Sequence, residues 1–164
     1  MTTGREGALT REEDAVIRAL LPAVTAMLKA FDADLLRAER MTHSEFLVLM
    51  FLSEAPARTL RLSELAALTQ KSLSAVSRAV GRLENDGLVR RVQAAEDGRG
   101  FNAVLTDAGL AGLEHARATH AASIRRHLID HLGDIDLDGL ARSLESIASS
   151  AGSAPTSRRS SPGR

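Results

Sequence analysis

The 164-residue sequence contains no cysteine, no tryptophan and no tyrosine. Without cysteine, disulfides, thiolate metal sites and cysteine nucleophiles are excluded. With only four phenylalanines, a platform that stacks single-stranded bases on aromatic rings is not expected. Apolar runs of about eighteen residues, which a membrane-spanning helix needs, are also missing, and the first residues lack the apolar segment of a signal peptide. We therefore expect a cytoplasmic protein without a membrane partner.

The composition is that of one folded domain rather than of a disordered chain. Hydrophobic residues make up 44% of the sequence and charged residues 26%, and the length does not suggest two independent domains. The formal net charge is zero, but residues 58–106 carry eight basic and five acidic side chains. This local excess of positive charge indicates an anion-binding surface in the middle of the chain.

Two helices are predicted before this basic segment. Thr10 with Glu13, and Thr42 with Glu45, have the spacing of capping boxes, which satisfy free backbone donors at the start of a helix. The second helix contains FLVLMFL and ends at Pro56, and we expect it to be buried because it is apolar around most of its circumference. The first helix has an apolar stripe with helical spacing: Val16, Leu20, Val24, Met27, Leu28, Phe31 and Leu35.

A helix-turn-helix is predicted in the basic segment. A short helix over about Leu62–Leu68 is followed by the polar break Thr69–Lys71, and a second helix begins after Ser72, whose hydroxyl suits an N-cap. Gly87 is expected to end this second helix. Its apolar side should face the core: Leu73, Val76, Val80 and Leu83. Its polar side carries Ser74, Arg78, Gly81, Arg82 and Asn85, with Ala75 at the edge.

The polar side of this second helix suits the major groove of DNA. Small residues near its start allow a close approach, and serine and arginine side chains donate to phosphates and base edges. A solvated amphipathic helix whose arginines contact nothing would show the same pattern. The segment that follows helps to decide between the two interpretations.

A β-hairpin is predicted directly after this helix. LVRRVQ and FNAVLT have the composition of strands, and the Asp97-Gly98 pair between them favours a tight turn. Arg99 lies near the tip, where a cation can enter a narrow minor groove. A helix-turn-helix followed by such a hairpin is a winged helix, and a hairpin that only shields the core is the alternative.

The stretches LSELAALT, SLSAVSRAVGRLENDGLVRR, EDGRG and AVLTDAG together resemble the multiple antibiotic resistance regulator (MarR) family of bacterial transcription factors, over about Leu60–Gly109. The resemblance implies that the helix over Ser72–Asp86 enters the major groove and that Arg99 enters the minor groove. It also implies a dimer that most often represses transcription until a small effector binds. The residues expected to contact DNA or to orient the contacts are Lys71, Ser72, Ser74, Ala75, Ser77, Arg78, Arg82, Arg91, Asp97 and Arg99.

Two further helices are predicted after the hairpin. Thr106 can cap a long helix that Gly133 ends, and a second apolar stripe follows: Leu137, Leu140, Leu144, Ile147 and Ala148. His127 and His131 lie one helical turn apart, a spacing that can bind a transition metal. A third ligand is missing, so we expect exposed or interfacial histidines.

Residues Asp134–Glu145 match the pattern of an EF-hand calcium loop, but two features oppose this interpretation. Ile135 and Leu137 are apolar where that loop is polar, and Arg142 stands where the loop offers an oxygen. We instead expect a helix whose first turn is stabilised by acidic side chains at its positive end: Asp134, Asp136 and Asp138.

Together these patterns predict a mainly α fold. A winged helix-turn-helix with a two-stranded β wing should occupy residues 58–106, flanked by dimerisation helices over residues 11–57 and 107–150. Residues 1–10 and 151–164 should be disordered. We expect a homodimer that binds double-stranded DNA and a small effector, with no cofactor and no metal. A winged-helix protein-interaction module without DNA binding is the alternative, whereas no arrangement typical of an enzyme is evident.

Overall fold

The structure is a computed structural model of the chain, in which residues 7–93 and 100–152 are described. Residues 1–6 and 153–164, from the two ends predicted to be disordered, lie outside the described residues, as does the wing turn at 94–99. The chain divides after Ile129 into two compact units. In chain order the elements are α1 (Arg11–Glu39), α2 (His43–Glu54), η1 (Pro56–Arg58), β1 (Thr59–Arg61), α3 (Leu62–Thr69), α4 (Leu73–Asn85), β2 (Val89–Gln93), β3 (Phe101–Leu105), α5 (Asp107–His127), η2 (Ile129–His131) and α6 (Leu137–Gly152).

Side-chain caps determine where the first two helices begin. The Thr10 hydroxyl accepts from the backbone N of Glu13 at 3.2 Å, and the Glu13 carboxylate accepts from the backbone N of Thr10 at 2.8 Å. Thr42 and Glu45 form the same pair of bonds, at 3.2 and 2.7 Å. Both predicted capping boxes are therefore confirmed, and so is the end of α2 just before Pro56.

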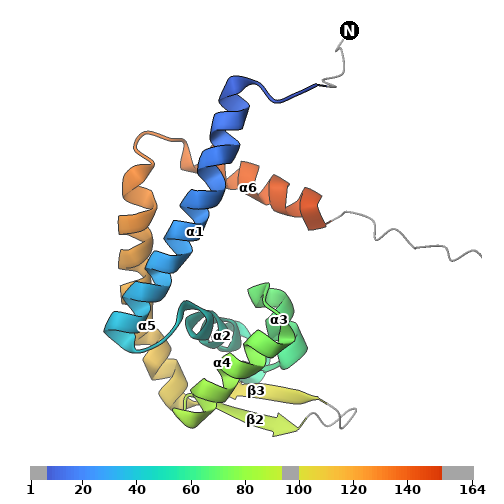
Figure 1. Ribbon diagram of the computed structural model, residues 1–164. Helices are drawn as coiled ribbons and strands as arrows, with labels where there is room; N and C mark the ends of the chain where they lie inside the picture. The colour runs from blue at the N-terminus through green and yellow to red at the C-terminus, as the bar shows by residue number, and fades with distance from the viewer. Residues whose placement is uncertain (1–6, 94–99, 153–164) are drawn as a thin grey trace, which may run out of the picture. The chain divides into compact units, whose positions relative to one another are not determined.

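Helix α2 forms the centre of the first unit, with contacts to α1, α3, α4, α5 and β3 (Figure 1). Its burial was predicted from its apolar circumference and is confirmed by Phe46, Val48, Leu49 and Leu52, which are at most 2% exposed. Burying each such side chain stabilises the fold by about 1.5 to 3 kcal/mol. The remaining core residues come from every neighbouring element, among them Leu35, Leu65, Val80, Leu83, Val89, Leu105 and Leu113.

The hairpin predicted after the second helix of the basic segment is present as β2 and β3, which pair antiparallel with Arg91 opposite Ala103. The structure adds a third strand that the sequence did not indicate. Strand β1 pairs with the other edge of β3, with Leu60 opposite Ala103, so the strand order is β1-β3-β2. Because β1 is only three residues long, it shows no alternation that could reveal it. It ties the wing to the start of α3.

The apolar stripe of α1 divides into a buried part and an exposed part. Phe31 and Leu35 belong to the core of their own unit, at 6% and 0% exposed. The N-terminal half of α1 extends away from α2 and α4 (Figure 1). Its large apolar side chains are exposed: Val16, Ile17, Leu20, Leu21, Val24 and Leu28. Phe31 and Leu35 therefore pack within the protomer, and the exposed part of the stripe remains available to a partner.

A buried carboxylate joins α1 to α5. Asp34 is 7% exposed and accepts from the hydroxyl of Ser123 at 2.8 Å, where Ser123 is itself 1% exposed. His127 Nε2 lies 3.0 Å from the same carboxylate, and the guanidinium groups of Arg37 and Arg126 lie 3.0 and 3.3 Å away. No local pattern in the sequence indicates this cluster, because its α1 and α5 members are far apart along the chain: Asp34 and Ser123 are separated by 89 residues. It also gives His127 a partner within the fold.

The Asp34 cluster predicts a loss of stability in acid. The Ser123 hydrogen bond, followed by those from His127 and Arg37, lowers the pKa of Asp34 below 3.8, although burial opposes the shift. A lowered pKa stabilises the fold above the ordinary value and loses that contribution as the pH falls through the folded value. The difference in unfolding free energy between wild type and Asp34→Asn should therefore shrink below about pH 4. Denaturation at several pH values measures it, and a constant difference would contradict the assignment.

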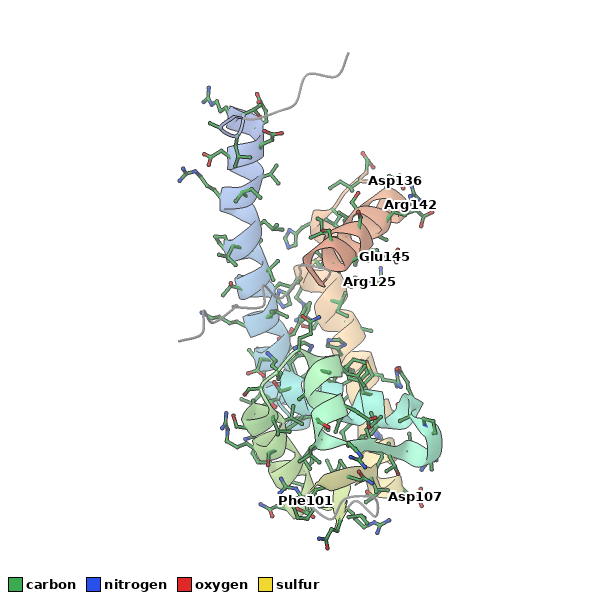
Figure 2. The ribbon with its side chains drawn as sticks, turned by 90° about the vertical axis from the view of Figure 1, so that its right-hand side faces the viewer. Phe101, Asp107, Arg125, Asp136, Arg142 and Glu145 are labelled. Atoms are coloured by element: carbon green, nitrogen blue, oxygen red, sulfur yellow. The ribbon has the colours of Figure 1, made fainter. Side chains whose placement is uncertain are left out.

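The second unit contains the segment that matches a calcium-loop pattern. Helix α6 starts at Leu137, so positions four to twelve of the pattern are helical and do not form a loop, as predicted. Figure 2 shows Asp136 before the helix, and Arg142 and Glu145 on it. The expected first turn is correct for Asp138 but wrong for Asp134 and Asp136, which precede α6. Arg142 lies 3.9 Å from Asp136 and reduces the negative charge there.

Two further observations concern the described residues as a whole. Within residues 7–93 and 100–152, no three histidine or carboxylate side chains are grouped as metal ligands would be. No described helix combines the length and the apolar character needed to cross a membrane.

Helix α5 ends at His127 rather than at Gly133, where the sequence placed its end.

Candidate nucleic-acid interface

Helices α3 and α4 form the predicted helix-turn-helix. Helix α3 ends at Gln70, whose left-handed conformation (φ 52°) turns the chain, and the backbone N of Lys71 donates to Ala66 O at 3.0 Å. The hydroxyl of Ser72 then accepts from the backbone N of Ala75 at 3.2 Å and caps α4, as predicted. Gly87 follows the helix with φ 73°, a conformation that a residue with a side chain rarely adopts.

The buried side of α4 agrees with the sequence prediction except at its first residue. Val76, Val80 and Leu83 are at most 2% exposed, and Ala79 joins them. Leu73, which was expected to share this side, is 55% exposed. As the first residue of the helix, it lines an open hollow beside Leu62 and Phe101 rather than the packed core.

The opposite side of α4 is open to solvent. Ser74 and Arg78 are exposed and lie one helical turn apart, and the hydroxyl of Ser74 is 3.1 Å from that of Ser72. Within the described residues, Arg78 has neither a hydrogen bond nor an ion pair. Its guanidinium group therefore remains available for a ligand. Lys71 is exposed just before the helix, whereas Ala75 and Ser77 are half-buried at its two edges.

Arg82, a further arginine predicted to contact DNA, is held by the protein itself. Its Nε donates to Oε1 of Glu45, whose side chain is 7% exposed, while the other oxygen of Glu45 completes the cap of α2. One carboxylate thus ties α4 to the start of α2. The side chain of Arg82 is still 53% exposed, so part of it faces solvent beside Arg78.

Arg91 of β2 holds the wing against α4. Its Nη2 donates to the carbonyl oxygen of Ser77, and its Nε lies 3.5 Å from the carboxylate of Glu84. The backbone N of Arg91 donates to the same carboxylate at 3.0 Å. A Cβ at Gly81 would lie 3.3 Å from Arg91 Nη2, so the glycine leaves room for this guanidinium. The side chain of Arg91 is only 27% exposed, which points to a positioning role.

Replacing Arg91 with alanine should therefore lower the stability of the fold. We expect the free energy of unfolding to fall by about 1 to 2 kcal/mol, because the Ser77 carbonyl and the Glu84 carboxylate lose a charged partner. Arg90 provides a matched control, since its side chain is exposed and makes no hydrogen bond or ion pair among the described residues. Chemical denaturation should find Arg90→Ala close to wild type. Equal effects of the two substitutions would show that Arg91 does not fasten the wing.

The structure thus brings together most of the residues predicted to contact DNA. Lys71, Ser72, Ser74 and Arg78 form an exposed surface at the start of α4. Arg82 and Arg91 flank this surface and are anchored by Glu45 and Glu84. The sequence indicated Glu45 only as a capping residue, and sequence reasoning predicted neither ion pair. Asp97 and Arg99, predicted for the wing tip, lie outside the described residues.

Comparisons with known proteins agree with this geometry. A family model described as MarR family matches residues 41–100. Among solved structures, the chain is similar to Sco3205, a MarR family transcriptional regulator from Streptomyces coelicolor solved in complex with DNA. The identity is 33% over 94% of this chain and 96% of that one, with a TM-score of 0.81. No curated protein sequence matches the chain.

Two more solved structures extend the comparison. AbsC, another MarR family transcriptional regulator from Streptomyces coelicolor, is 34% identical over 90% of this chain and 99% of its own, with a TM-score of 0.79. The transcriptional regulator BldR from Sulfolobus solfataricus is 23% identical over 87% and 99%, with a TM-score of 0.74, and supports the fold alone. The chain therefore belongs to the MarR family, as a DNA-binding transcriptional regulator and not an enzyme.

Proposed function

We propose that the protein is a homodimeric repressor that binds a palindromic operator and releases it when a small anionic effector binds. The exposed side of α4 carries this proposal, because the Arg78 side chain has no partner among the described residues and Ser74 contacts only the neighbouring Ser72 hydroxyl there. An arginine in this position can donate two hydrogen bonds to a guanine edge in the major groove. The alternative, a protein-interaction module, would not need this open polar surface.

Gel-shift experiments test the proposal directly. DNA from upstream of the protein's own gene should be shifted and should resist an excess of unrelated duplex, because specific binding exceeds non-specific binding by orders of magnitude. An in vitro transcription assay with the same DNA should show repression. If unrelated duplex displaces the protein from this DNA as readily as unlabelled operator does, sequence-specific recognition is contradicted. Absence of any shift at low salt would favour the protein-interaction module.

The exposed stripe of α1 supports the homodimer. A surface with this many large apolar side chains needs a cover, and a second copy of the same helix provides one across a two-fold axis. The two DNA-binding regions of one dimer then select half-sites about 34 to 36 Å apart. A single DNA-binding region would make too few contacts with DNA for high affinity.

Val24→Asp is expected to raise the dissociation constant of the dimer at least about tenfold, because it places a charge in the apolar stripe. Val24 is 37% exposed in the single chain, so the substitution should leave the protomer folded. Ala26→Asp is the control, since it lies about 160° away around the helix and is also exposed. Sedimentation equilibrium measures both variants. Equal dimer dissociation constants for the two variants would show that the dimer interface does not include this stripe.

A cavity of about 510 Å³ between α1, the start of α2 and the turn before α4 is the candidate effector site. Lys29, Lys71, His43 and Asp32 line it together with Leu28 and Leu36. Because two lysines face one carboxylate there, the cavity favours a small molecule with an anionic group and an apolar body. Burial lowers the pKa of His43, the nearby Lys71 lowers it further, and Asp32 acts in the opposite direction. Because Lys71 directly precedes the cap of α4, a ligand here would act on the DNA-binding surface.

A further inference from the structure

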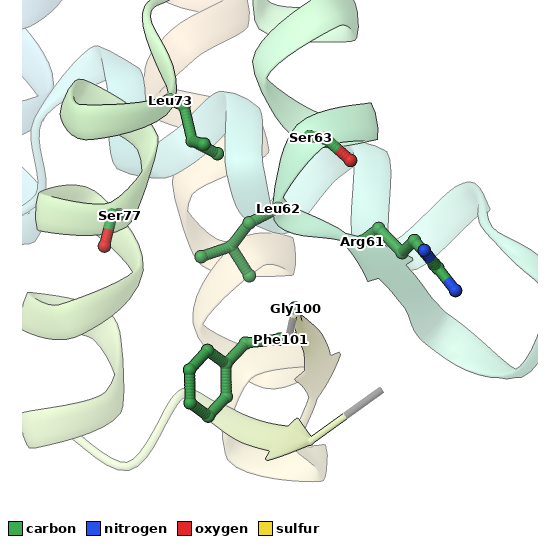
Figure 3. Close-up of a pocket in the computed structure, with 7 residues that line it drawn as sticks. All are labelled: Arg61, Leu62, Ser63, Leu73, Ser77, Gly100 and Phe101. Atoms are coloured by element: carbon green, nitrogen blue, oxygen red, sulfur yellow. The ribbon is translucent and has the colours of Figure 1, made fainter. Parts of the chain in front are cut away.

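A second hollow, of about 320 Å³, lies beside the start of α4 (Figure 3). Helix α4 provides Leu73 and Ser77, the start of α3 provides Leu62 and Ser63, and the wing provides Phe101. The hollow is separate from the candidate effector site. It opens between the helix and the hairpin that together form the DNA-binding region.

Two large apolar side chains of this hollow are exposed to solvent. Leu73 is 55% exposed and Phe101 is 51% exposed, whereas Leu62 between them is 8% exposed. Figure 3 shows the Leu73 side chain and the Phe101 ring on either side of Leu62. Leu73 therefore contributes little to the core, and an apolar partner from outside the chain would cover it.

DNA offers such a partner at this position. In a helix-turn-helix, the first residues of the recognition helix contact base edges in the major groove. The 5-methyl group of thymine is the one apolar group that the base edges display there. Leu73 is the first residue of α4, directly before Ser74 and five residues before Arg78. Its exposed side chain is thus on the helix end that approaches the bases.

We propose that Leu73 is a specificity-determining residue that packs against the 5-methyl group of a thymine in each half-site, with Phe101 closing the apolar side of the hollow. The hydroxyl groups of Ser63 and Ser77 line the same hollow and can donate to the phosphate of that nucleotide. This inference rests on the proposed DNA-binding function and adds a base preference to it. This role of Leu73 was not predicted from the sequence, because helical periodicity assigned the residue to the core.

Selection from a random duplex pool, followed by replacement of single thymines with deoxyuridine, tests the inference. Deoxyuridine lacks only the methyl group, so wild type should lose about fourfold in affinity at one thymine per half-site, the ratio for one buried methyl group. Leu73→Ala should bind the thymine duplex about as weakly as wild type binds the uracil duplex. It should lose nothing more when that thymine is replaced.

Leu68→Ala is the control, because Leu68 is 47% exposed on α3 and does not line the hollow. It should keep the wild-type sensitivity to deoxyuridine. The same sensitivity in Leu73→Ala, no sensitivity in wild type, or a selected site without thymine would each overturn the inference alone. If wild type enriches no duplex from the pool, the proposed function fails together with it.

Discussion

Replacing Asp34 with alanine should lower the free energy of unfolding by about 2 to 4 kcal/mol at neutral pH. Asp34 is the common acceptor for Ser123, Arg37, Arg126 and His127, and it is the only carboxylate among the described residues that these four share. Alanine leaves the buried hydroxyl of Ser123 without its acceptor and leaves the cations around it without a counter-charge. Chemical denaturation followed by circular dichroism measures the loss.

Asp14→Ala is the matched control for this prediction. Asp14 lies on the same helix and also pairs with an arginine, since Arg18 Nε is 2.6 Å from its carboxylate, but the Asp14 side chain is 46% exposed and that of Arg18 is 77% exposed. Exposed pairs one turn apart contribute only about 0.3 to 0.5 kcal/mol. A loss for Asp34→Ala no larger than that of the control would show that the cluster does not hold α1 to α5.

Arg78→Ala should weaken operator binding by about 1 to 3 kcal/mol and relax the base preference at one position in each half-site. Arg78 is exposed on α4 with no partner among the described residues, so its removal should leave the melting temperature nearly unchanged. Fluorescence anisotropy with operator and with single-base variants measures both effects. Loss of affinity should depend on the base at one position only.

Arg18→Ala removes the same charge from an exposed site on α1 and should leave operator binding unchanged. A uniform loss across all sequences in Arg78→Ala would show that this arginine contacts phosphate rather than a base. Wild-type affinity in that variant would show that another surface of α4 faces DNA.

Local signals in the sequence predicted the fold well, because capping and turn chemistry act over three or four residues. Thr10, Thr42 and Ser72 all cap the helices that they were expected to cap. Long-range pairs were missed for the opposite reason. Glu45 is 37 residues from Arg82, and Asp34 is 89 residues from Ser123, so no local pattern connects them.

In the candidate site, too, local patterns were predicted correctly and contacts between elements were not. The exposed polar side of α4 follows from helical periodicity, and Ser74 and Arg78 lie where the sequence placed them. Periodicity failed at Leu73, because it gives the direction of a side chain but not whether a neighbouring element covers it. It also failed to separate Arg78, which is available to DNA, from Arg82, which Glu45 holds against the start of α2.

Hydroxyl-radical footprinting of the protein on its selected operator tests most directly whether a dimer reads the DNA sequence with α4. The footprint locates the α4 helices of both protomers on one duplex. Two protected segments should appear, related by a two-fold axis and centred about 10 base pairs or a multiple of that distance apart. Each segment should weaken in Arg78→Ala at the same base step. A single protected segment, or protection spread evenly along the DNA, would contradict a dimer that reads sequence with α4.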